Sequence, residues 1–180
     1  MAPTEAAPTE MAPTETAPNE MGPNEMAPTD YRIAMIAAQW HAELVDVATT
    51  SCRDHLLEAG VAAEAIRLIT VPGSLELPLV AQLAANSGDF DAVLAFGLVV
   101  DGGIYRHEFV ANAILNGFVA VSTATEVPVL SAVLTPQRFD ENDPGDLAFF
   151  AEHLVGKGIE IARSALEVVS VVRALRQEVR

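Results

Sequence analysis

The chain has 180 residues, of which 51% are hydrophobic, and this is enough for one domain with a sizeable core. Its formal net charge of −15 argues against nucleic acid as a partner, because nucleic-acid binding needs a basic face. Cys52 is the only cysteine, which excludes an intrachain disulfide and a cysteine-rich metal site, and no apolar run approaches the roughly 18 residues of a membrane span. We therefore expect a cytoplasmic protein, since the sequence also lacks the basic and apolar start of a secretory signal.

Residues 1–30 consist of six five-residue units, MAPTE, AAPTE, MAPTE, TAPNE, MGPNE and MAPTD. Each unit has proline third and an acidic residue last, and the segment contains no base. Without apolar periodicity it cannot bury enough surface to offset the entropy of ordering. We expect a disordered acidic tail at residues 1–30, either a spacer around an assembly or an extension without a selected role, and one folded domain at residues 31–180.

Four short apolar runs in the folded part are rich in Val, Ile, Leu and Ala and do not alternate with polar residues. They lie at residues 32–38, 65–71, 91–99 and 127–134. Such runs are typical of strands that are buried on both faces.

Helical patterns alternate with these strands. The first runs from about Leu44 to a stop at Gly60, since apolar residues recur there at intervals of three and four. Three more lie at about residues 75–86, 105–121 and 146–176, and we expect Gly156 and Gly158 to break or kink the last of them. The alternation predicts an α/β protein, a three-layer sandwich in which helices cover both faces of a four-stranded, flavodoxin-like parallel sheet.

The most informative junction is FGLVVDGGIYRHEFV, residues 96–110. An apolar strand ends there in Asp101 and two glycines, and Arg106 and His107 follow at the start of a helix. Paired glycines let the backbone approach a ligand closely, and the free N–H groups of a helix start favour an anion. Taken alone, the junction could also be a tight turn whose charged residues face water.

Two other strand ends have a similar character. Residues 69–80, ITVPGSLELPLV, pass through Pro-Gly-Ser into a helix with Glu76 near its start, and Trp40 and His41 follow the first strand. Ligands of parallel α/β sheets bind outside the carboxyl ends of the strands. We therefore expect the three junctions to form one site.

These motifs resemble the lumazine synthase family over about residues 31–169. The most specific stretches are VPGSLELP, GLVVDGGIYRHEFV, NGF at 116–118, EVPVLSAVLTP and GKG at 156–158. Trp40-His41, DGGIYRH and the Ser131 position resemble the type II branch of that family, which assembles as decamers.

The resemblance implies an enzyme of riboflavin biosynthesis. It would join 5-amino-6-(D-ribitylamino)uracil to 3,4-dihydroxy-2-butanone 4-phosphate and release 6,7-dimethyl-8-ribityllumazine, phosphate and water, without a metal or redox cofactor. It would also form a homo-oligomer, a pentamer or a decamer of two pentamers, with active sites between subunits. The alternative is a low-activity scaffold that binds a flavin or lumazine. A generic nucleotide binder is less consistent with the sequence, which has no GxGxxG or P-loop motif.

The resemblance also assigns roles to the first two junctions. Trp40 would supply the ring that stacks on the pyrimidine, although by itself it would be interpreted as a core tryptophan at a strand end. His41 would be a loop residue with a packing or polar contact. Ser74, Leu75 and Glu76 match the segment that holds the ribityl chain, and Glu76 would also complement the helix dipole.

At the third junction, Leu98, Val99 and Val100 match the strand end that binds the pyrimidine through main-chain groups. Gly103 and Ile104 match the positions that bind the phosphate of the butanone substrate, which is consistent with a helix N-terminus.

Arg106 stands where most members of the family have a histidine regarded as the proton-transfer residue. Arginine binds anions strongly but stays protonated near neutrality, whereas histidine titrates there. We therefore assign Arg106 to the phosphate and the departing anion, and His107 or an ordered water to proton transfer. An ideal helix would place His107 about 100° away from Arg106, which counts against this role. The alternative, a histidine on the helix surface with no part in the reaction, fits the sequence equally well.

Three further positions concern the type II branch and the neighbouring subunit. Asp101 and Ser131 replace the arginine and the aromatic residue found in many relatives, so stacking from the neighbour would be lost at Ser131. Lys157 matches a basic residue donated to the phosphate across an interface, although alone it would be a solvated lysine. Arg138 and His153 are weaker candidates, because residues 136–150 have no secure register against the family.

Overall fold

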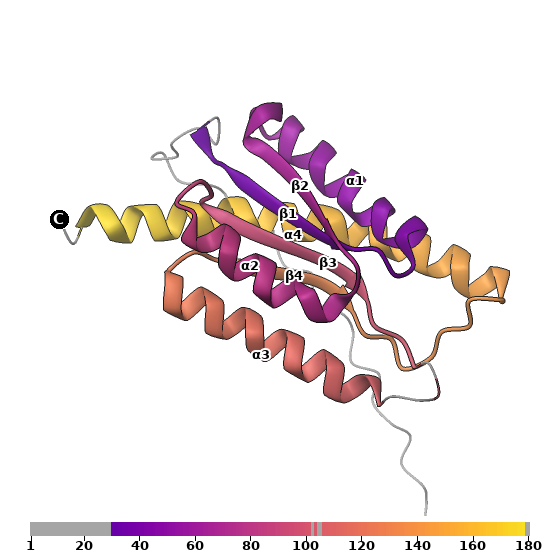
Figure 1. The fold of residues 1–180 in the computed structure, drawn as a ribbon. Helices are drawn as coiled ribbons and strands as arrows, with labels where there is room; N and C mark the ends of the chain where they lie inside the picture. The colour runs from indigo at the N-terminus through magenta and orange to yellow at the C-terminus, as the bar shows by residue number, and fades with distance from the viewer. Residues whose placement is uncertain (1–29, 102, 104–105, 179–180) are drawn as a thin grey trace, which may run out of the picture.

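The computed structural model describes residues 30–178 except Gly102, Ile104 and Tyr105. Four parallel strands form one sheet in the order β2-β1-β3-β4 (Figure 1). The strands are β1 (Ile33–Ala38), β2 (Ile66–Val71), β3 (Ala92–Leu98) and β4 (Val129–Leu134). Each strand lies within two residues of its predicted bounds, so the strand prediction is confirmed. The expectation for the acidic segment falls on residues 1–29, outside the described residues.

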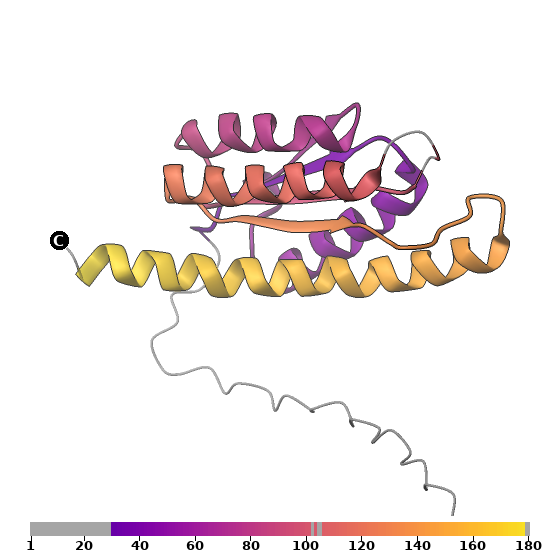
Figure 2. The same ribbon diagram turned by 90° about the horizontal axis from the view of Figure 1, so that it is seen from below.

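Four α-helices connect or follow the strands. They are α1 (Ala42–Glu58), α2 (Leu77–Asn86), α3 (His107–Thr125) and α4 (Pro144–Glu178), with short 3-10 turns at Ala63–Ala65 and Ser74–Glu76. Helices α2 and α3 cover one face of the sheet, and α1 and α4 cover the other (Figure 2). This confirms the three-layer α/β sandwich, with the strand order of flavodoxin-like proteins.

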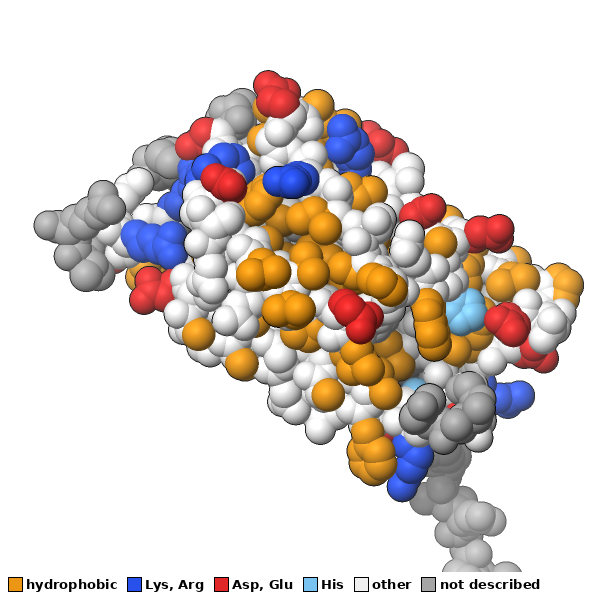
Figure 3. Space-filling model, viewed as in Figure 1, with side chains coloured by type: hydrophobic (Ala, Val, Ile, Leu, Met, Phe, Trp, Pro, Cys, Tyr) orange, Lys and Arg blue, Asp and Glu red, His pale blue; other side chains and the backbone are white. Residues whose placement is uncertain are grey.

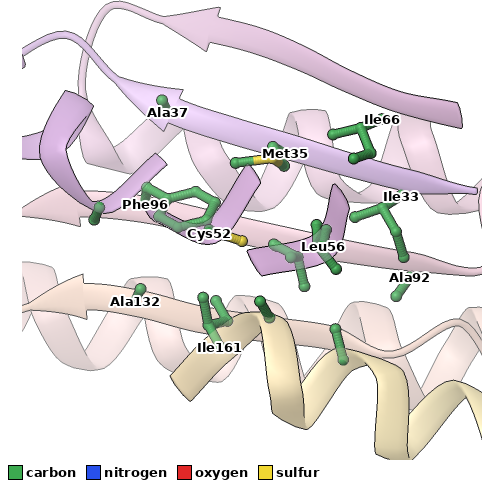
Figure 4. Close-up of a cluster of buried hydrophobic side chains, with 14 of the residues drawn as sticks. Ile33, Met35, Ala37, Cys52, Leu56, Ile66, Ala92, Phe96, Ala132 and Ile161 are labelled. Atoms are coloured by element: carbon green, nitrogen blue, oxygen red, sulfur yellow. The ribbon is translucent and has the colours of Figure 1, made fainter. Parts of the chain in front are cut away.

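The two central strands, β1 and β3, are buried along their whole length, because helices cover both of their faces. Met35 and Phe96 point from them into the core shared with α1 and α4, where Cys52 also lies (Figure 4). The edge strands β2 and β4 are only partly buried. The sequences of β1 and β3 are therefore continuously apolar for the reason that we predicted, which is that both faces of these strands are buried.

Helix α4 corrects one prediction. It continues from Pro144 to Glu178 without a break at Gly156 or Gly158. A Cβ atom at Gly158 would overlap the Ser51 hydroxyl and the Ala48 carbonyl oxygen, and would lie 2.9 Å from the backbone nitrogen of Cys52. Gly158 is thus explained by the close approach of α4 to α1 and not by a change of direction.

The amino end of the sheet is joined to the end of α4 by Arg173. Its guanidinium donates to the Asp30 carboxylate at 2.6 Å, lies 3.1 Å from an Asp91 oxygen and stands 4.5 Å from the centre of the Tyr31 ring. Burial alone would lower the pKa of Arg173, but the hydrogen bonds to Asp30 and Asp91 outweigh it and raise that pKa. Arg32 pairs with the same Asp91 carboxylate at 3.7 Å.

The opposite, carboxyl edge of the sheet is where the junctions meet. In the parallel register Ala38 is paired with Val71, and Leu98 with Leu134, so these strands end at the same level. The segments that follow them, including Trp40, therefore emerge side by side. Among the helices of the described residues, none is long and apolar enough to cross a membrane.

Candidate active site

A cleft of about 1200 Å³ lies at the carboxyl edge of the sheet, bounded by the segments that follow all four strands. Ten of the residues singled out in the sequence line it: Trp40, His41, Ser74, Leu75, Glu76, Leu98, Val99, Val100, Asp101 and His107. Three separate junctions thus converge on one hollow. A second hollow of about 960 Å³, between α3, β4 and α4, contains none of the predicted site residues.

Trp40 lies in the turn between β1 and α1, and the residue is 70% exposed. This exposure excludes the interpretation of Trp40 as a core tryptophan. His41 follows with φ 54° and ψ 43°, a left-handed conformation that few non-glycine residues adopt. Its carbonyl oxygen accepts the N–H groups of Leu44 and Val45, each at 3.0 Å, and so begins α1.

Ser74, Leu75 and Glu76 form the 3-10 turn that leads into α2. A Cβ atom at Gly97 of β3 would lie 2.9 Å from the Ser74 hydroxyl, so the glycine makes room for the serine at this wall of the cleft. Leu75 and Glu76 are exposed at the mouth of the cleft. A hydroxyl, an apolar side chain and a carboxylate are therefore presented together to a ligand.

The β3–α3 junction separates Arg106 from His107. Arg106 is the N-cap of α3 with extended backbone, φ −75° and ψ 99°, and its guanidinium lies 4.8 Å from the centre of the Phe109 ring. His107 is the first helical residue, its side chain is only 13% exposed, and it lines the cleft, whereas Arg106 does not. Because Arg106 is not helical, the angle expected from an ideal helix does not apply to this pair.

Gly103 adopts a positive φ of 72°, which glycine tolerates without strain, and its N–H donates to the Asp101 carboxylate at 2.9 Å. Asp101 lines the cleft, but Gly103 is not among the lining residues. Ile104, the other predicted phosphate-binding position, lies outside the described residues.

Ser131 and Lys157 do not line the cleft of their own chain. Ser131 is exposed on the edge strand β4, where its hydroxyl accepts the N–H of Val133 at 3.2 Å. Lys157 lies within α4 and pairs with Glu160 at 2.5 Å. The resemblance to the family predicts that both positions contribute to the site of a neighbouring subunit.

The loop between β4 and α4 supplies a wall of the cleft that we did not predict. Phe139, Asp140, Glu141 and Asn142 line it. The loop is held by an Asp140 N–H that donates to the Asp146 carboxylate at 2.8 Å and an Asn142 N–H that donates to Asp140 at 2.9 Å. The sequence could have indicated this wall, because the segment that follows a fourth parallel strand emerges at the same edge of the sheet as the segments that follow the other three.

The lining is acidic. It contains Glu76, Asp101, Asp140 and Glu141, and no lysine or arginine occurs among the described residues that line it. A phosphorylated ligand would have to be met by backbone N–H groups or by cations from the rim or from another chain. The described residues also contain no group of three His, Cys, Asp or Glu side chains suited to a metal ion.

Comparison with known proteins gives consistent matches. The family model described as 6,7-dimethyl-8-ribityllumazine synthase matches residues 30–173. The chain is 44% identical to the 6,7-dimethyl-8-ribityllumazine synthase of Rhodococcus erythropolis, over 80% of this chain and 92% of that protein. It is 40% identical to 6,7-dimethyl-8-ribityllumazine synthase 2 of Pseudomonas syringae pv. tomato, over 81% and 85% respectively, and 41% identical to the synthase 2 of Bradyrhizobium diazoefficiens, over 82% and 88%.

Proposed function

The chain belongs to the 6,7-dimethyl-8-ribityllumazine synthase family, and we propose that the cleft at the carboxyl edge of its sheet is where the lumazine is made. The protein is a transferase of riboflavin biosynthesis that condenses 5-amino-6-(D-ribitylamino)uracil with 3,4-dihydroxy-2-butanone 4-phosphate. The single observation that carries the location is the convergence of Trp40, Glu76 and His107 on one hollow.

The pyrimidine would lie between the Trp40 ring and the end of β3. An exposed indole offers a flat apolar surface, and a stacked ring pair contributes about 0.5–1.5 kcal/mol beyond the burial of area. Leu98, Val99 and Val100 line the same cleft, and the Val99 N–H donates to the Leu134 carbonyl oxygen at 2.8 Å. The main-chain groups of this strand end that the sheet does not use would meet the edge of the pyrimidine ring. The ribityl hydroxyls would meet the Ser74–Glu76 turn.

The phosphate of the second substrate would bind near the start of α3. The N–H groups of a helix start and the cationic Arg106 both favour an anion there. The acidic lining makes such help necessary, because none of the described residues that line the cleft is a lysine or an arginine. We propose that Lys157 of a neighbouring subunit supplies a further positive charge, and that Ser131 of that subunit faces the pyrimidine without stacking on it.

His107 is our choice for proton transfer during imine formation and phosphate elimination. It is the histidine at this junction that lines the cleft, and a positioned side chain of this kind contributes typically 10²–10⁴-fold to a rate. Arg106 would stabilise the departing phosphate. Holding both substrates together would supply much of the remaining acceleration, up to about 7–11 kcal/mol in favourable cases.

We propose that the protein acts as a homo-oligomer, a pentamer or a decamer of two pentamers. Hydrophobic side chains gather over the α2 and α3 face (Figure 3), and Leu79, Leu83 and Val119 there are each more than 60% exposed. Exposed hydrophobic side chains that gather on one face commonly mark an interface. A cytoplasmic location stays a prediction from composition.

The activity is tested by incubating the purified full-length chain with both substrates and following the absorbance of the lumazine product. Omission of either substrate is the control for background reactions. Product at enzyme-like rates supports the proposed site if Trp40→Ala slows its formation. Binding of lumazine without turnover would instead indicate the scaffold alternative, which the names of the relatives do not favour.

A further inference from the structure

Trp40 stands at the mouth of the cleft with little to hold its ring. The residue is 70% exposed, and none of the aromatic ring pairs of the described residues includes it. The direction of the indole therefore depends on the backbone that carries it. A stacking surface is useful only if that direction is fixed, since a freely rotating ring must be ordered anew each time a ligand binds.

The backbone next to Trp40 is in an unfavourable conformation. His41 has the left-handed values φ 54° and ψ 43°, and among the described residues only Glu126 shares a positive φ without being glycine. A conformation of this kind persists where the surrounding structure determines it. His41 makes no side-chain hydrogen bond that would cap α1, so the helix start alone does not account for it.

Besides the N–H groups of Leu44 and Val45 that its carbonyl oxygen accepts, His41 has a side-chain contact with the loop between β4 and α4. The rings of His41 and Phe139 meet edge to face, with centres 5.2 Å apart and planes at 80°. Phe139 meets Phe150 of α4 in the same way, at 5.3 Å and 74°. Phe139 and Phe150 are half-buried and pack against the core beneath the sheet. A row of three rings thus runs from the long helix to the residue beside Trp40.

From this row we infer that Phe139 is a positioning residue, which acts through His41 to fix the Trp40 indole over the pyrimidine site. The identity of the ligand in this inference rests on the proposed function. The link from Phe139 through His41 to Trp40 does not depend on that function. Phe139 belongs to the β4–α4 wall of the cleft, and its ring contacts His41 in the β1–α1 wall of the same cleft. Its ring therefore sets the spacing and the relative orientation of the two walls.

The chain contains a single tryptophan, so its fluorescence reports Trp40 alone. We expect Phe139→Leu, which keeps apolar volume but removes the ring, to increase the fast nanosecond component of the time-resolved anisotropy of Trp40. Phe139→Tyr keeps the ring and should restore the wild-type decay. Phe149→Leu is the matched control, because Phe149 is 61% exposed, contacts Phe150 and His153, and does not line the cleft.

Kinetics give the second readout. Phe139→Leu should raise the KM for the pyrimidine about three- to tenfold, as expected for the loss of one ordered ring contact, and leave the KM for the phosphate ester unchanged. A purely structural defect would instead lower the active fraction and reduce kcat without this separation. If Phe139→Leu does not fold, as judged by circular dichroism, Phe139→Met replaces it with a larger unbranched side chain.

The two hypotheses can fail separately. If the wild-type protein makes no lumazine, the proposed function is wrong, and the anisotropy of Phe139→Leu still tests the link. If the wild type is active but Trp40 moves no faster in Phe139→Leu or Phe139→Met, and the pyrimidine KM is unchanged, then Phe139 is not a positioning residue.

Discussion

Gly158 of α4 lies so close to Ala48 of α1 that the Ala48 carbonyl oxygen occupies the space in which a side chain at position 158 would begin. At Gly156, two residues earlier on the same helix, a Cβ atom would meet nothing within 4 Å. The two glycines therefore form a natural comparison between a packed position and an open one.

We expect Gly158→Ala to lower the free energy of unfolding by about 1–3 kcal/mol or more, because backbone atoms of α1 cannot move aside as a flexible side chain can. Gly156→Ala should leave it unchanged or raise it by up to about 1 kcal/mol, since alanine is the better helix former. Urea denaturation of both variants provides the measurement. Equal losses at the two positions would show that packing against α1 is not the reason for Gly158.

Trp40→Ala should weaken binding of the pyrimidine substrate, because it removes the flat surface on that side of the cleft. We expect the pyrimidine KM to rise about tenfold, from a lost stacking contact together with lost burial of area. Trp40→Phe, which keeps an aromatic ring, should recover most of the affinity. Calorimetric titration checks the result, and unchanged affinity in Trp40→Ala would remove Trp40 from the site.

Arg106→Ala should raise the KM for the phosphorylated substrate more than the KM for the pyrimidine, because the guanidinium is assigned to the anion. The expected change is roughly tenfold, the size of one charge-assisted hydrogen bond. Arg163→Ala is the control, since it removes the same charge from an exposed position of α4 away from the cleft. A larger effect on the pyrimidine would refute the role given to Arg106.

His107→Gln should lower kcat about a hundredfold or more with smaller changes in either KM, as expected if the imidazole moves protons in the reaction and contributes little to binding. His153→Gln removes a histidine that stacks on Phe149 outside the cleft and should leave kcat as it is. Steady-state rates measured with each substrate in turn provide the comparison. A kcat close to wild type in His107→Gln would assign proton transfer to water.

Burial raises the pKa of the Cys52 thiol from 9.0 to about 12. The folded chain keeps a proton that the unfolded chain releases in this interval, so the contribution of Cys52 to stability is present below about pH 9 and is lost as the pH rises toward 12. We expect Cys52→Ala to show a shallower decline in the free energy of unfolding over this window than the wild type. Parallel declines, measured by urea titration at several pH values, would count against a buried neutral thiol.

The fold could be predicted because the strand signal is local. The runs around Met35 and Phe96 are continuously apolar, and strands covered on both faces require that composition. Gly158 shows the opposite case. Glycine in a helix is unfavourable by itself, so the sequence suggested a break, but the atoms that require glycine lie on α1, about a hundred residues away in the chain.

The lining of the cleft was predicted where a motif follows a strand end, and it was not predicted where the loop has no motif. Trp40, Glu76 and His107 were found in this way, and they line the cleft. Phe139 was missed, because an aromatic residue in a loop carries no sign of its partners, and its contacts with His41 and Phe150 depend on tertiary packing. The sequence also could not predict that Trp40 is exposed, because an apolar residue at the end of a strand can be either buried or exposed.

Helix α4, about 52 Å long from its 35 residues, begins beside the cleft and ends past Arg173, which holds Asp30 at the other end of the domain (Figure 1). The described part of the chain consequently begins at the pole remote from substrate entry. A fluorophore attached to a described residue at this pole should leave diffusion into the cleft of the same chain unobstructed.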